Sequence, residues 1–422
     1  MAVNYTKKQI GNGITLHVMT DPKFKTSIFR FYFIFPHTAQ KAAAYTLPAY
    51  MIEDTNSEYP DITSFNSRLA ELYGADVSSS IQRFSDCRLT MVSASSIADK
   101  YALDGENISF ELLKLICGCI FRPVLDENGV FPKKQFDLKL NEMIDDINAV
   151  INDKRNYAFK QAGSLIYSGE PCGIPLKGEA EEAAKLTQKE AYDAYMEMLS
   201  TARTEIFYVG TALPEGCEDY ILSCFDGIDR HDICTPEYAP SPIKDEICEG
   251  SDTLDVTQNK MVMGFKYEGI YPDAVTRLFG VMFGGSPTSL LFKNVREKLS
   301  LCYYCDSSRN KFKSTFYVDS GLEAANTDAA RKEILHQLDV IKKGEFSDEL
   351  FEQSKLFIKT SLRAVEDFPT SVAGWYLDRI IDEKVLSPVE YAEAIDKVTK
   401  QDITALANDI RLDTVYVLKG SE

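Results

Sequence analysis

The side chains with the clearest chemical potential in this sequence are an arginine and a tyrosine seven residues apart, Arg296 and Tyr303. They follow a double glycine, Gly284 and Gly285. A fixed guanidinium and a phenol can stabilise the charge that develops on a carbonyl oxygen under attack. The same residues also fit a structural interpretation, in which Arg296 complements the dipole near a helix end and Tyr303 is a half-buried strand residue. The pair is therefore a candidate substrate-binding site. The residues around it have to distinguish this interpretation from the structural one.

The sequence offers no set of residues with metal-ligand spacing. It has no His-x-x-x-His pair and only four scattered histidines: His17, His37, His231 and His336. Cys302 and Cys305 have CxxC spacing, but one such pair supplies at most half of a structural zinc site. Other cysteines, such as Cys117 and Cys119, lie among apolar neighbours, which is typical of reduced, buried thiols. We therefore assign neither metal ligands nor catalytic residues to this chain.

The elements that must position these residues follow an α+β order rather than the regular alternation of a doubly wound parallel sheet. Runs of strand-forming residues predict strands over 14–20, 27–35, 76–82, 87–94 and 204–209. Helical spacing of apolar residues predicts helices over 42–53, 64–72, 111–120, 136–167 and 189–199. Together these elements account for the first half of the chain.

The second half repeats the end of the first. Residues 185–190, a helix and a strand over 206–210 have their counterpart in residues 397–402, a helix and a strand over 415–420. The offsets are 397 − 185 = 212 and 415 − 206 = 209 residues, which suits a duplicated domain and is far too long for a solenoid repeat. A stretch rich in proline and glycine separates the halves. The predicted organisation is an N-terminal domain, a linker and a C-terminal domain: 1–225, 226–250 and 251–422.

These features, in this order, resemble the insulinase/pitrilysin-like (inverzincin) metallopeptidase family, and the resemblance covers nearly the whole chain. It implies an α+β fold of two homologous α/β-sandwich halves, each an antiparallel sheet packed by helices (LuxS/processing-peptidase-like), that form a clam shell around a peptide. In the family, an arginine after a double-glycine loop binds the substrate and a tyrosine hydrogen-bonds the carbonyl under attack. The resemblance implies these substrate-binding roles for Arg296 and Tyr303, with Gly284 and Gly285 forming the loop.

The zinc motif of that family is missing from this chain. In active members, the helix after the first long strand carries H-x-x-E-H, whose histidines bind zinc and whose glutamate is the general base. Aligning the Met-Ile that follows this stretch with the Met-Leu that commonly follows the motif puts Thr46, Ala49 and Tyr50 at the three chemical positions. A third ligand would fall near Asp146, although a lone carboxylate is more typical of a solvated helix face.

Two further stretches resemble a bacterial branch of the family, in which a subunit without the motif is paired with one that has it. They are residues 152–158 and residues 168–173 followed by Gly178. The same residues also fit a helix start and core contacts, so they narrow the subfamily without defining a site.

The leading functional prediction is an inactive homologue that acts as the non-catalytic, substrate-binding subunit of a heterodimeric zinc metallopeptidase. A homologous partner bearing the zinc motif would hydrolyse the peptide, and the only cofactor expected is that partner's zinc. The alternative is a peptide-binding or structural protein that retained the fold and holds a segment, for example at a sheet edge. A third reading, an active peptidase with unusual ligands, is disfavoured because a catalytic zinc normally needs three protein ligands.

Composition restricts the partners further. The chain has 46 Lys and Arg against 64 Asp and Glu, a net charge of −18, with the acids spread along its length. Such a surface argues against binding to nucleic acid or to an anionic membrane. No apolar run reaches the roughly 18 residues of a membrane span, and the first residues lack a signal-peptide apolar core. We therefore expect a cytoplasmic protein.

Overall fold

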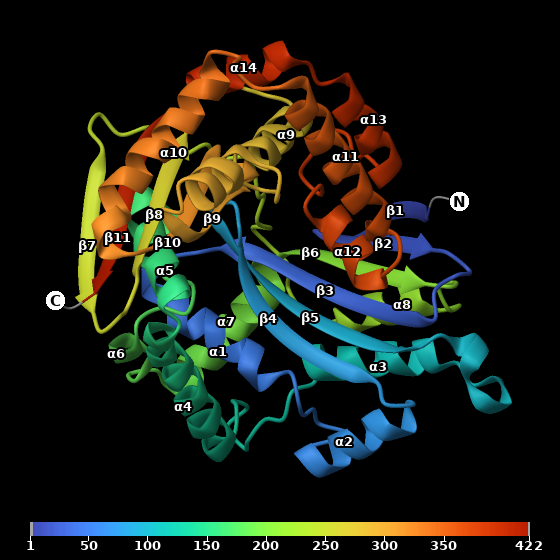
Figure 1. The fold of residues 1–422 in the computed structure, drawn as a ribbon. Coiled ribbons are helices and arrows are strands. Elements are labelled where there is room, and N and C mark those ends of the chain that lie inside the picture. Colours follow the sequence, from blue (N-terminus) through green and yellow to red (C-terminus); the bar gives the residue numbers. More distant parts are fainter. Residues whose placement is uncertain (1–2, 421–422) are drawn as a thin grey trace. The chain divides into compact units, whose positions relative to one another are not determined.

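The computed structural model describes residues 3–420, which form two compact units (Figure 1). Unit 1 comprises residues 3–148, 174–236 and 365–385, and unit 2 comprises residues 149–173, 237–364 and 386–420. Each unit contains one β-sheet with helices packed on it. The predicted α+β fold class with two homologous halves is therefore confirmed.

Unit 1 is built on a six-stranded sheet with the order β1-β2-β6-β3-β5-β4. Its strands are β1 (Asn4–Gly11), β2 (Ile14–Thr20), β3 (Thr26–Pro36), β4 (Asp76–Phe84), β5 (Cys87–Ile97) and β6 (Arg203–Gly210). The pair β2–β6 is parallel and the other neighbours are antiparallel. All five strands predicted for this half are present, and β1 is an additional edge strand that the pattern did not indicate.

Strand β3 is buried on both faces because helices cover both sides of this sheet. Its alternate residues Phe29, Phe31 and Phe33 belong to the main hydrophobic core of unit 1. On the opposite face, Arg30 donates a hydrogen bond to the Thr370 carbonyl oxygen at 3.3 Å. That carbonyl belongs to α12 (Pro369–Leu377), which contacts β3 and β6.

The remaining helices of unit 1 are α1 (Ala42–Met51), α2 (Ile62–Glu71), α3 (Ile108–Phe121), α4 (Lys133–Ala149), α6 (Ala180–Ala183), α7 (Gln188–Thr201) and α8 (Cys217–Cys224). The single helix predicted over 136–167 is wrong, because α4 ends at Ala149 and α5 (Lys154–Ile166) begins afresh. The Asp153 carboxylate accepts a hydrogen bond from the Asn156 backbone N–H at 3.0 Å, and this N-cap starts the second helix.

Unit 2 repeats the sheet plan of unit 1. Its five strands, in the order β7-β11-β8-β10-β9, are β7 (Cys248–Leu254), β8 (Asn259–Lys266), β9 (Cys302–Asn310), β10 (Thr315–Leu322) and β11 (Arg411–Gly420). The pair β7–β11 is parallel, like β2–β6 in unit 1, and the other neighbours are antiparallel. This order matches β2-β6-β3-β5-β4. Strand β7 begins inside the stretch expected to be linker, because its polar residues alternate between half-buried and exposed on a sheet edge and carry no apolar strand signal.

The helices of unit 2 besides α5 are α9 (Asp273–Phe283), a π-helical segment (Leu291–Lys298), α10 (Thr327–Lys342), α11 (Asp348–Val365), α13 (Pro388–Lys397) and α14 (Lys400–Asp409). Helix α5 packs on β7, β8 and β11 and, with the buried Ala158, Ala162 and Ile166, forms a small core beneath Val262.

The compact units do not follow the sequence halves at every point. Residues 149–173, with α5, lie in unit 2 although they precede residue 225, and residues 365–385, with α12, lie in unit 1 although they follow residue 251. The two segments start 365 − 149 = 216 residues apart, close to the offset of the sequence repeat. Each sheet is therefore covered on one side by a helix from the other sequence half.

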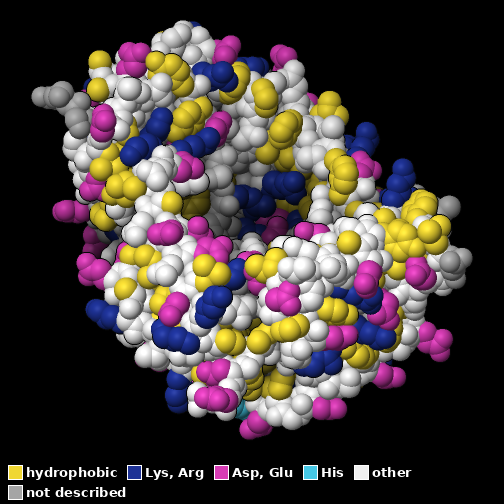
Figure 2. Space-filling model, turned by 90° about the horizontal axis from the view of Figure 1, so that it is seen from below, with side chains coloured by type: hydrophobic (Ala, Val, Ile, Leu, Met, Phe, Trp, Pro, Cys, Tyr) yellow, Lys and Arg dark blue, Asp and Glu magenta, His cyan; other side chains and the backbone are white. Residues whose placement is uncertain are grey.

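The surface carries both signs of charge, and no described helix is both long and apolar enough to span a bilayer. Figure 2 shows lysine and arginine side chains interspersed with aspartate and glutamate on the face in view. The acidic excess is thus distributed rather than gathered into one patch on that face.

Candidate functional site

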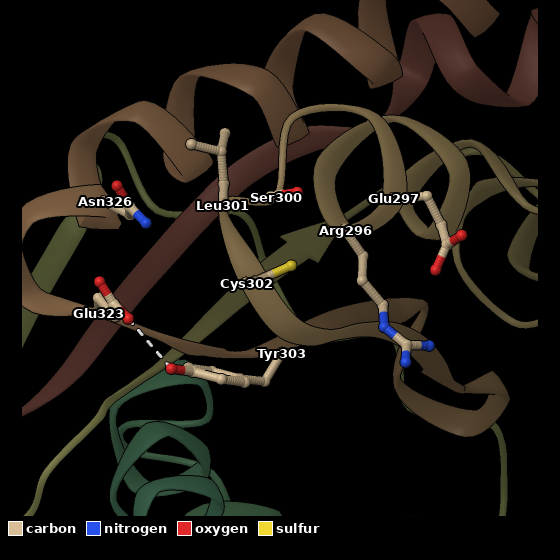
Figure 3. A pocket seen from close by; sticks show the side chains of 8 residues that line it. All are labelled: Arg296, Glu297, Ser300, Leu301, Cys302, Tyr303, Glu323 and Asn326. Carbon is tan, nitrogen blue, oxygen red and sulfur yellow. Dashed lines mark hydrogen bonds between the residues drawn. The ribbon is translucent and has the colours of Figure 1, made fainter.

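Arg296 and Tyr303 line one cavity of about 500 Å³ in unit 2 (Figure 3). Arg296 comes from the last turn of the π-helical segment, and Tyr303 is the second residue of β9. Ser300, with its positive φ of 51°, makes the turn that joins the two elements. The spacing read from the sequence therefore brings the pair to one cavity, with Cys302 and Glu323 also in its lining.

The tyrosine presents its hydroxyl to solvent and to one carboxylate. The Tyr303 side chain is 52% exposed, and its hydroxyl donates a hydrogen bond to Glu323 Oε1 at 3.1 Å. That bond raises the pKa of Tyr303, so the phenol keeps its proton at neutral pH. To donate a hydrogen bond to a substrate, the Tyr303 hydroxyl would have to break its bond to Glu323. Because the ring is exposed, water can replace that bond at a small free-energy cost.

The arginine is oriented by stacking rather than by an ion pair. Its guanidinium lies 4.5 Å from the centre of the Phe292 ring, four residues earlier on the same segment. Figure 3 shows the guanidinium pointing away from Glu323, whereas the Tyr303 ring runs toward Glu323. Among the described residues no carboxylate is recorded within ion-pair distance of Arg296, which leaves its fork of N–H donors available to a carbonyl or carboxylate.

The double glycine has a packing role that the structure makes visible. A Cβ on Gly284 would lie 2.7 Å from the Ser307 backbone nitrogen, and a Cβ on Gly285 would lie 3.0 Å from the Gly280 carbonyl oxygen. Both residues sit at the end of α9, outside the set that lines the Arg296 cavity. They let α9 turn sharply toward the π-helical segment, so any part they take in substrate binding is through placement of that segment.

The CxxC pair adjoins the same cavity. Cys302 lines it and Cys305 is buried, and a hydrogen bond between the two thiols lowers the pKa of Cys302 and raises that of Cys305. No group of three or more His, Cys, Asp or Glu side chains in residues 3–420 is arranged to hold a metal ion.

In unit 1, the first motif position is occupied by a buried hydrogen-bond network. Thr46 on α1 is fully buried and donates to the Ala42 carbonyl oxygen at 2.8 Å. Its hydroxyl accepts a hydrogen bond from Arg88 at 2.8 Å. Arg88 is also fully buried, with further bonds to the carbonyl oxygens of Ala42 and Leu176. Burial lowers the pKa of Arg88 to about 9, which still leaves the guanidinium charged at neutral pH.

At the second histidine position, Tyr50 is joined to a carboxylate and an ammonium. Its hydroxyl donates to Asp146 Oδ2 at 2.6 Å, so the residue proposed for the third-ligand position does lie beside the motif. Lys177 Nζ donates to both Tyr50 Oη and Asp146 Oδ2, each at 2.7 Å. The bond from Lys177 and that from Tyr50 lower the pKa of Asp146, and burial raises the pKa of Tyr50, so the carboxylate is ionised and the phenol is not.

A glycine holds the lysine in this place. Gly178 has a positive φ of 74°, and a Cβ there would lie 3.0 Å from the Ala43 backbone nitrogen. Only a glycine lets the loop approach the start of α1 so closely. The result is a cavity of about 340 Å³ lined by Ala49, Tyr50, Glu53, Ser79, Ser80, Ile81, Asp146 and Lys177.

These residues do not fit a zinc ion. Of the usual ligand types only Asp146 and Glu53 are among the residues that line the cavity, and Ala49, which the alignment places at the general-base position, has no side chain that could act as a base. Two cationic side chains, Arg88 and Lys177, bond to the side chains at the former histidine positions and would repel a divalent cation. The sequence alone did not indicate Lys177 or Arg88, because each lies far along the chain from its partner on α1.

The fold is that of a zinc-peptidase-like protein, and basic side chains bond to Thr46 and Tyr50, the residues that the sequence alignment places at the two histidine positions of the zinc motif. A family model described as "Peptidase M16 inactive domain" matches residues 185–356, a range that includes Arg296 and Tyr303. The Bacillus subtilis protein named "Probable inactive metalloprotease YmfF" is 26% identical over 100% of this chain and 99% of its own length. A conserved protein from Enterococcus faecalis has a crystal structure that superposes with a TM-score of 0.88, at 25% identity and 99% coverage of both chains.

The likeness extends to eukaryotic members. Mitochondrial-processing peptidase subunit beta of Saccharomyces cerevisiae is 22% identical over 70% of this chain and 66% of its own length. The chain is thus similar to M16 metallopeptidases, as the insulinase/pitrilysin-like resemblance indicated, and it is a homologue of an inactive metalloprotease.

Proposed function

We propose that this chain is the non-catalytic, substrate-binding subunit of a heterodimeric zinc peptidase. A homologous partner with an intact H-x-x-E-H motif would supply the zinc and the general base. This chain would supply Arg296 and Tyr303, with Gly284 and Gly285 placing the segment that carries them. The observation that carries the proposal is that both side chains line one cavity. It is supported by the cations that bond to Thr46 and Tyr50, the residues aligned with the histidines of the zinc motif.

The chemistry of the pair suits this division of labour. The Arg296 guanidinium would hold a substrate carbonyl or carboxylate, and the Tyr303 hydroxyl would donate to the oxygen that gains charge when the partner's zinc-bound water attacks. The name of the yeast relative, a processing-peptidase subunit, supports a two-subunit arrangement. A cytoplasmic location is part of the proposal and is supported by the ten cysteines, which a reducing compartment keeps as thiols.

The test is the kinetics of the reconstituted pair with Tyr303→Phe or Arg296→Ala in this chain. Loss of a donor to a charged transition state typically costs about 2.7–4 kcal/mol, so Tyr303→Phe should lower kcat roughly 100- to 1000-fold. Arg296→Ala should raise KM as well, because the guanidinium holds the substrate in both ground and transition states.

Two matched variants control for surface effects. Tyr238 is 42% exposed and Arg411 is also exposed, and neither lines the Arg296 cavity, so Tyr238→Phe and Arg411→Ala should leave the kinetics unchanged. Melting temperatures of all four variants should stay near that of the wild type, because Tyr303, Tyr238 and Arg411 are exposed and Arg296 is only half-buried. If both Tyr303→Phe and Arg296→Ala kept the wild-type kcat and KM, the proposed substrate-binding role would be contradicted and the chain would have only a structural role in the pair.

A further inference from the structure

Two cysteine side chains of unit 1 are in contact, although they lie far apart in the sequence. Cys87 is the first residue of β5, and Cys234 lies in the segment that follows α8. Their Sγ atoms are 3.6 Å apart, whereas the residues are 147 positions apart along the chain. Both residues are half-buried, unlike Cys117 and Cys119 in the core, so neither is closed off from small molecules in solution. The fold therefore creates a thiol pair that spacing in the sequence does not reveal.

Both members of this thiol pair are anchored through the backbone. Cys87 pairs with Phe84 across the β4–β5 hairpin and with Pro36 at the end of β3. The Cys234 backbone N–H donates to the Thr201 carbonyl oxygen at 2.9 Å, which ties its segment to the end of α7. A disulfide bond is about 2 Å long, so each sulfur would have to move by only about 0.8 Å to form one. The geometry therefore permits a cross-link without a rearrangement of the sheet.

Cys234 is more acidic than an ordinary cysteine. A hydrogen bond from the Cys87 thiol lowers the pKa of Cys234, burial opposes that effect, and the nearby Arg203 guanidinium lowers the pKa further. An ion pair with the buried Glu205, at 2.5 Å, holds this guanidinium in place. The thiolate is the nucleophile in cysteine chemistry, so Cys234 is the residue that should attack an electrophile, and Cys87 lies next to it to attack in turn.

We propose that Cys87 and Cys234 form a reversible disulfide when the protein meets a hydroperoxide such as hydrogen peroxide, which makes the pair a redox modification site. The Cys234 thiolate attacks one peroxide oxygen and displaces hydroxide, which takes up a proton to become water, and Cys234 becomes a sulfenic acid. The Cys87 thiol then attacks the sulfenic sulfur, and its proton leaves with the expelled hydroxyl group as a second water. The two thiols lose two electrons in total, and these electrons reduce the peroxide.

The position of Cys234 gives this disulfide a consequence for the chain. The middle segment of unit 1 ends at Pro236, and the chain enters unit 2 at Glu237. A bond to Cys87 would therefore fasten the start of this connection to the β4–β5 hairpin of the first sheet. In reducing compartments, disulfides are usually transient and redox-sensing, which fits a pair that forms and breaks with the oxidant. This inference does not depend on the proposed heterodimer or on the Arg296 cavity.

The experiment uses the full chain, reduced with dithiothreitol, desalted and diluted enough to disfavour cross-links between chains. Hydrogen peroxide is added for a series of times and removed with catalase, the remaining thiols are alkylated with N-ethylmaleimide, and the non-reduced digest is mapped by mass spectrometry. We expect a cross-linked peptide that joins Cys87 to Cys234 and disappears after dithiothreitol. Cys234 should lose its alkylation about tenfold faster than Cys248, a half-buried cysteine of β7 with no thiol contact recorded among the described residues.

Three variants separate the steps of the reaction. Cys87→Ser should abolish the cross-link, while Cys234 accumulates as a sulfenic acid that dimedone traps. Cys234→Ser should leave Cys87 open to alkylation after the same exposure, and the control Cys248→Ser should form the cross-link like the wild type. The wild-type map decides the question even if a serine variant fails to fold. The proposal is overturned if Cys87 and Cys234 are still alkylated once Cys248 is oxidised, if other cysteines cross-link in comparable yield, or if the cross-link joins two chains.

Discussion

Restoring the zinc motif tests the claim that basic side chains now occupy the metal position. The perturbation is the triple change Thr46→His, Ala49→Glu and Tyr50→His. It would supply two imidazoles and a base on α1, with Asp146 beside them as a third ligand. We expect the triple variant to bind no stoichiometric zinc and to lack useful peptidase activity, because the cations that bond to these positions remain.

The size of the obstacle follows from the distances. Lys177 Nζ is 2.7 Å from both Tyr50 Oη and Asp146 Oδ2, so a zinc ion bound at these positions would lie about 5 Å or less from the ammonium. At an effective dielectric constant of about 20, a divalent and a monovalent charge at about 5 Å repel each other by about 7 kcal/mol. Because Lys177 is partly exposed and can swing toward solvent, about 3 kcal/mol is a more realistic cost, on the order of a 100-fold loss in zinc affinity. Arg88, whose guanidinium bonds to Thr46, adds to this repulsion.

The assay is zinc titration calorimetry and metal analysis of chelator-treated protein, for the triple variant and for the same variant with Lys177→Ala. Removing the ammonium should raise zinc affinity about 100-fold relative to the triple variant. Activity should still be poor, since Pro48 inside α1 withholds a backbone donor and the groups that would orient the new imidazoles are missing. One tightly bound zinc per chain in the triple variant, unchanged by Lys177→Ala, would refute the electrostatic argument.

Two further predictions concern stability. Burial raises the pKa of Asp319 to about 6 despite its ion pair with Arg155, so this carboxyl stabilises the fold below about pH 4 and loses that contribution as pH rises through 6. Asp319→Asn should therefore gain about 3 kcal/mol of unfolding free energy relative to wild type between pH 4 and 7.5, measured in urea, and a constant difference would contradict the raised pKa. Thr399→Ala removes the N-cap of α14, a hydroxyl that accepts from the Asp402 backbone N–H at 3.2 Å, and should cost about 1 kcal/mol, whereas Thr404→Ala within the helix should cost less.

Local patterns sufficed for most of the fold. Runs such as 27–35 combine aromatic and aliphatic strand formers, and both faces of β3 prove to be buried. The repeat of a helix and a strand at the end of each half correctly indicated two related sheets. Strand β7 was not predicted because it is a polar edge strand that forms by pairing with β11. The break between α4 and α5 was not predicted because it depends on one capping residue, Asp153. Both features come from contacts that hydrophobic periodicity does not record.

The candidate sites also differ in how far the sequence predicts them. The spacing of Arg296 and Tyr303 predicted a shared location, and the structure brings them to one cavity, while their role stays a proposal. Lys177 could not be found from spacing, because it is 127 residues from Tyr50 along the chain. The one local signal was the neighbouring Gly178, whose positive φ and close approach to α1 are what bring the lysine to the pocket.

The exchange of α5 and α12 between sequence halves has a consequence for how the protein is made. The face of the unit 1 sheet that carries Arg30 receives α12, whose residues leave the ribosome only after about 365 others have been synthesised. Until then, Tyr5 lacks the ring of Tyr376 on which it stacks at 4.1 Å, and the aromatic surface around it stays open. Unit 1 therefore cannot complete its fold until residues 365–385 have been made, whereas an independent N-terminal domain could fold earlier in synthesis. Nascent chains that stall before residue 365 would expose this surface to chaperones and to other nascent chains.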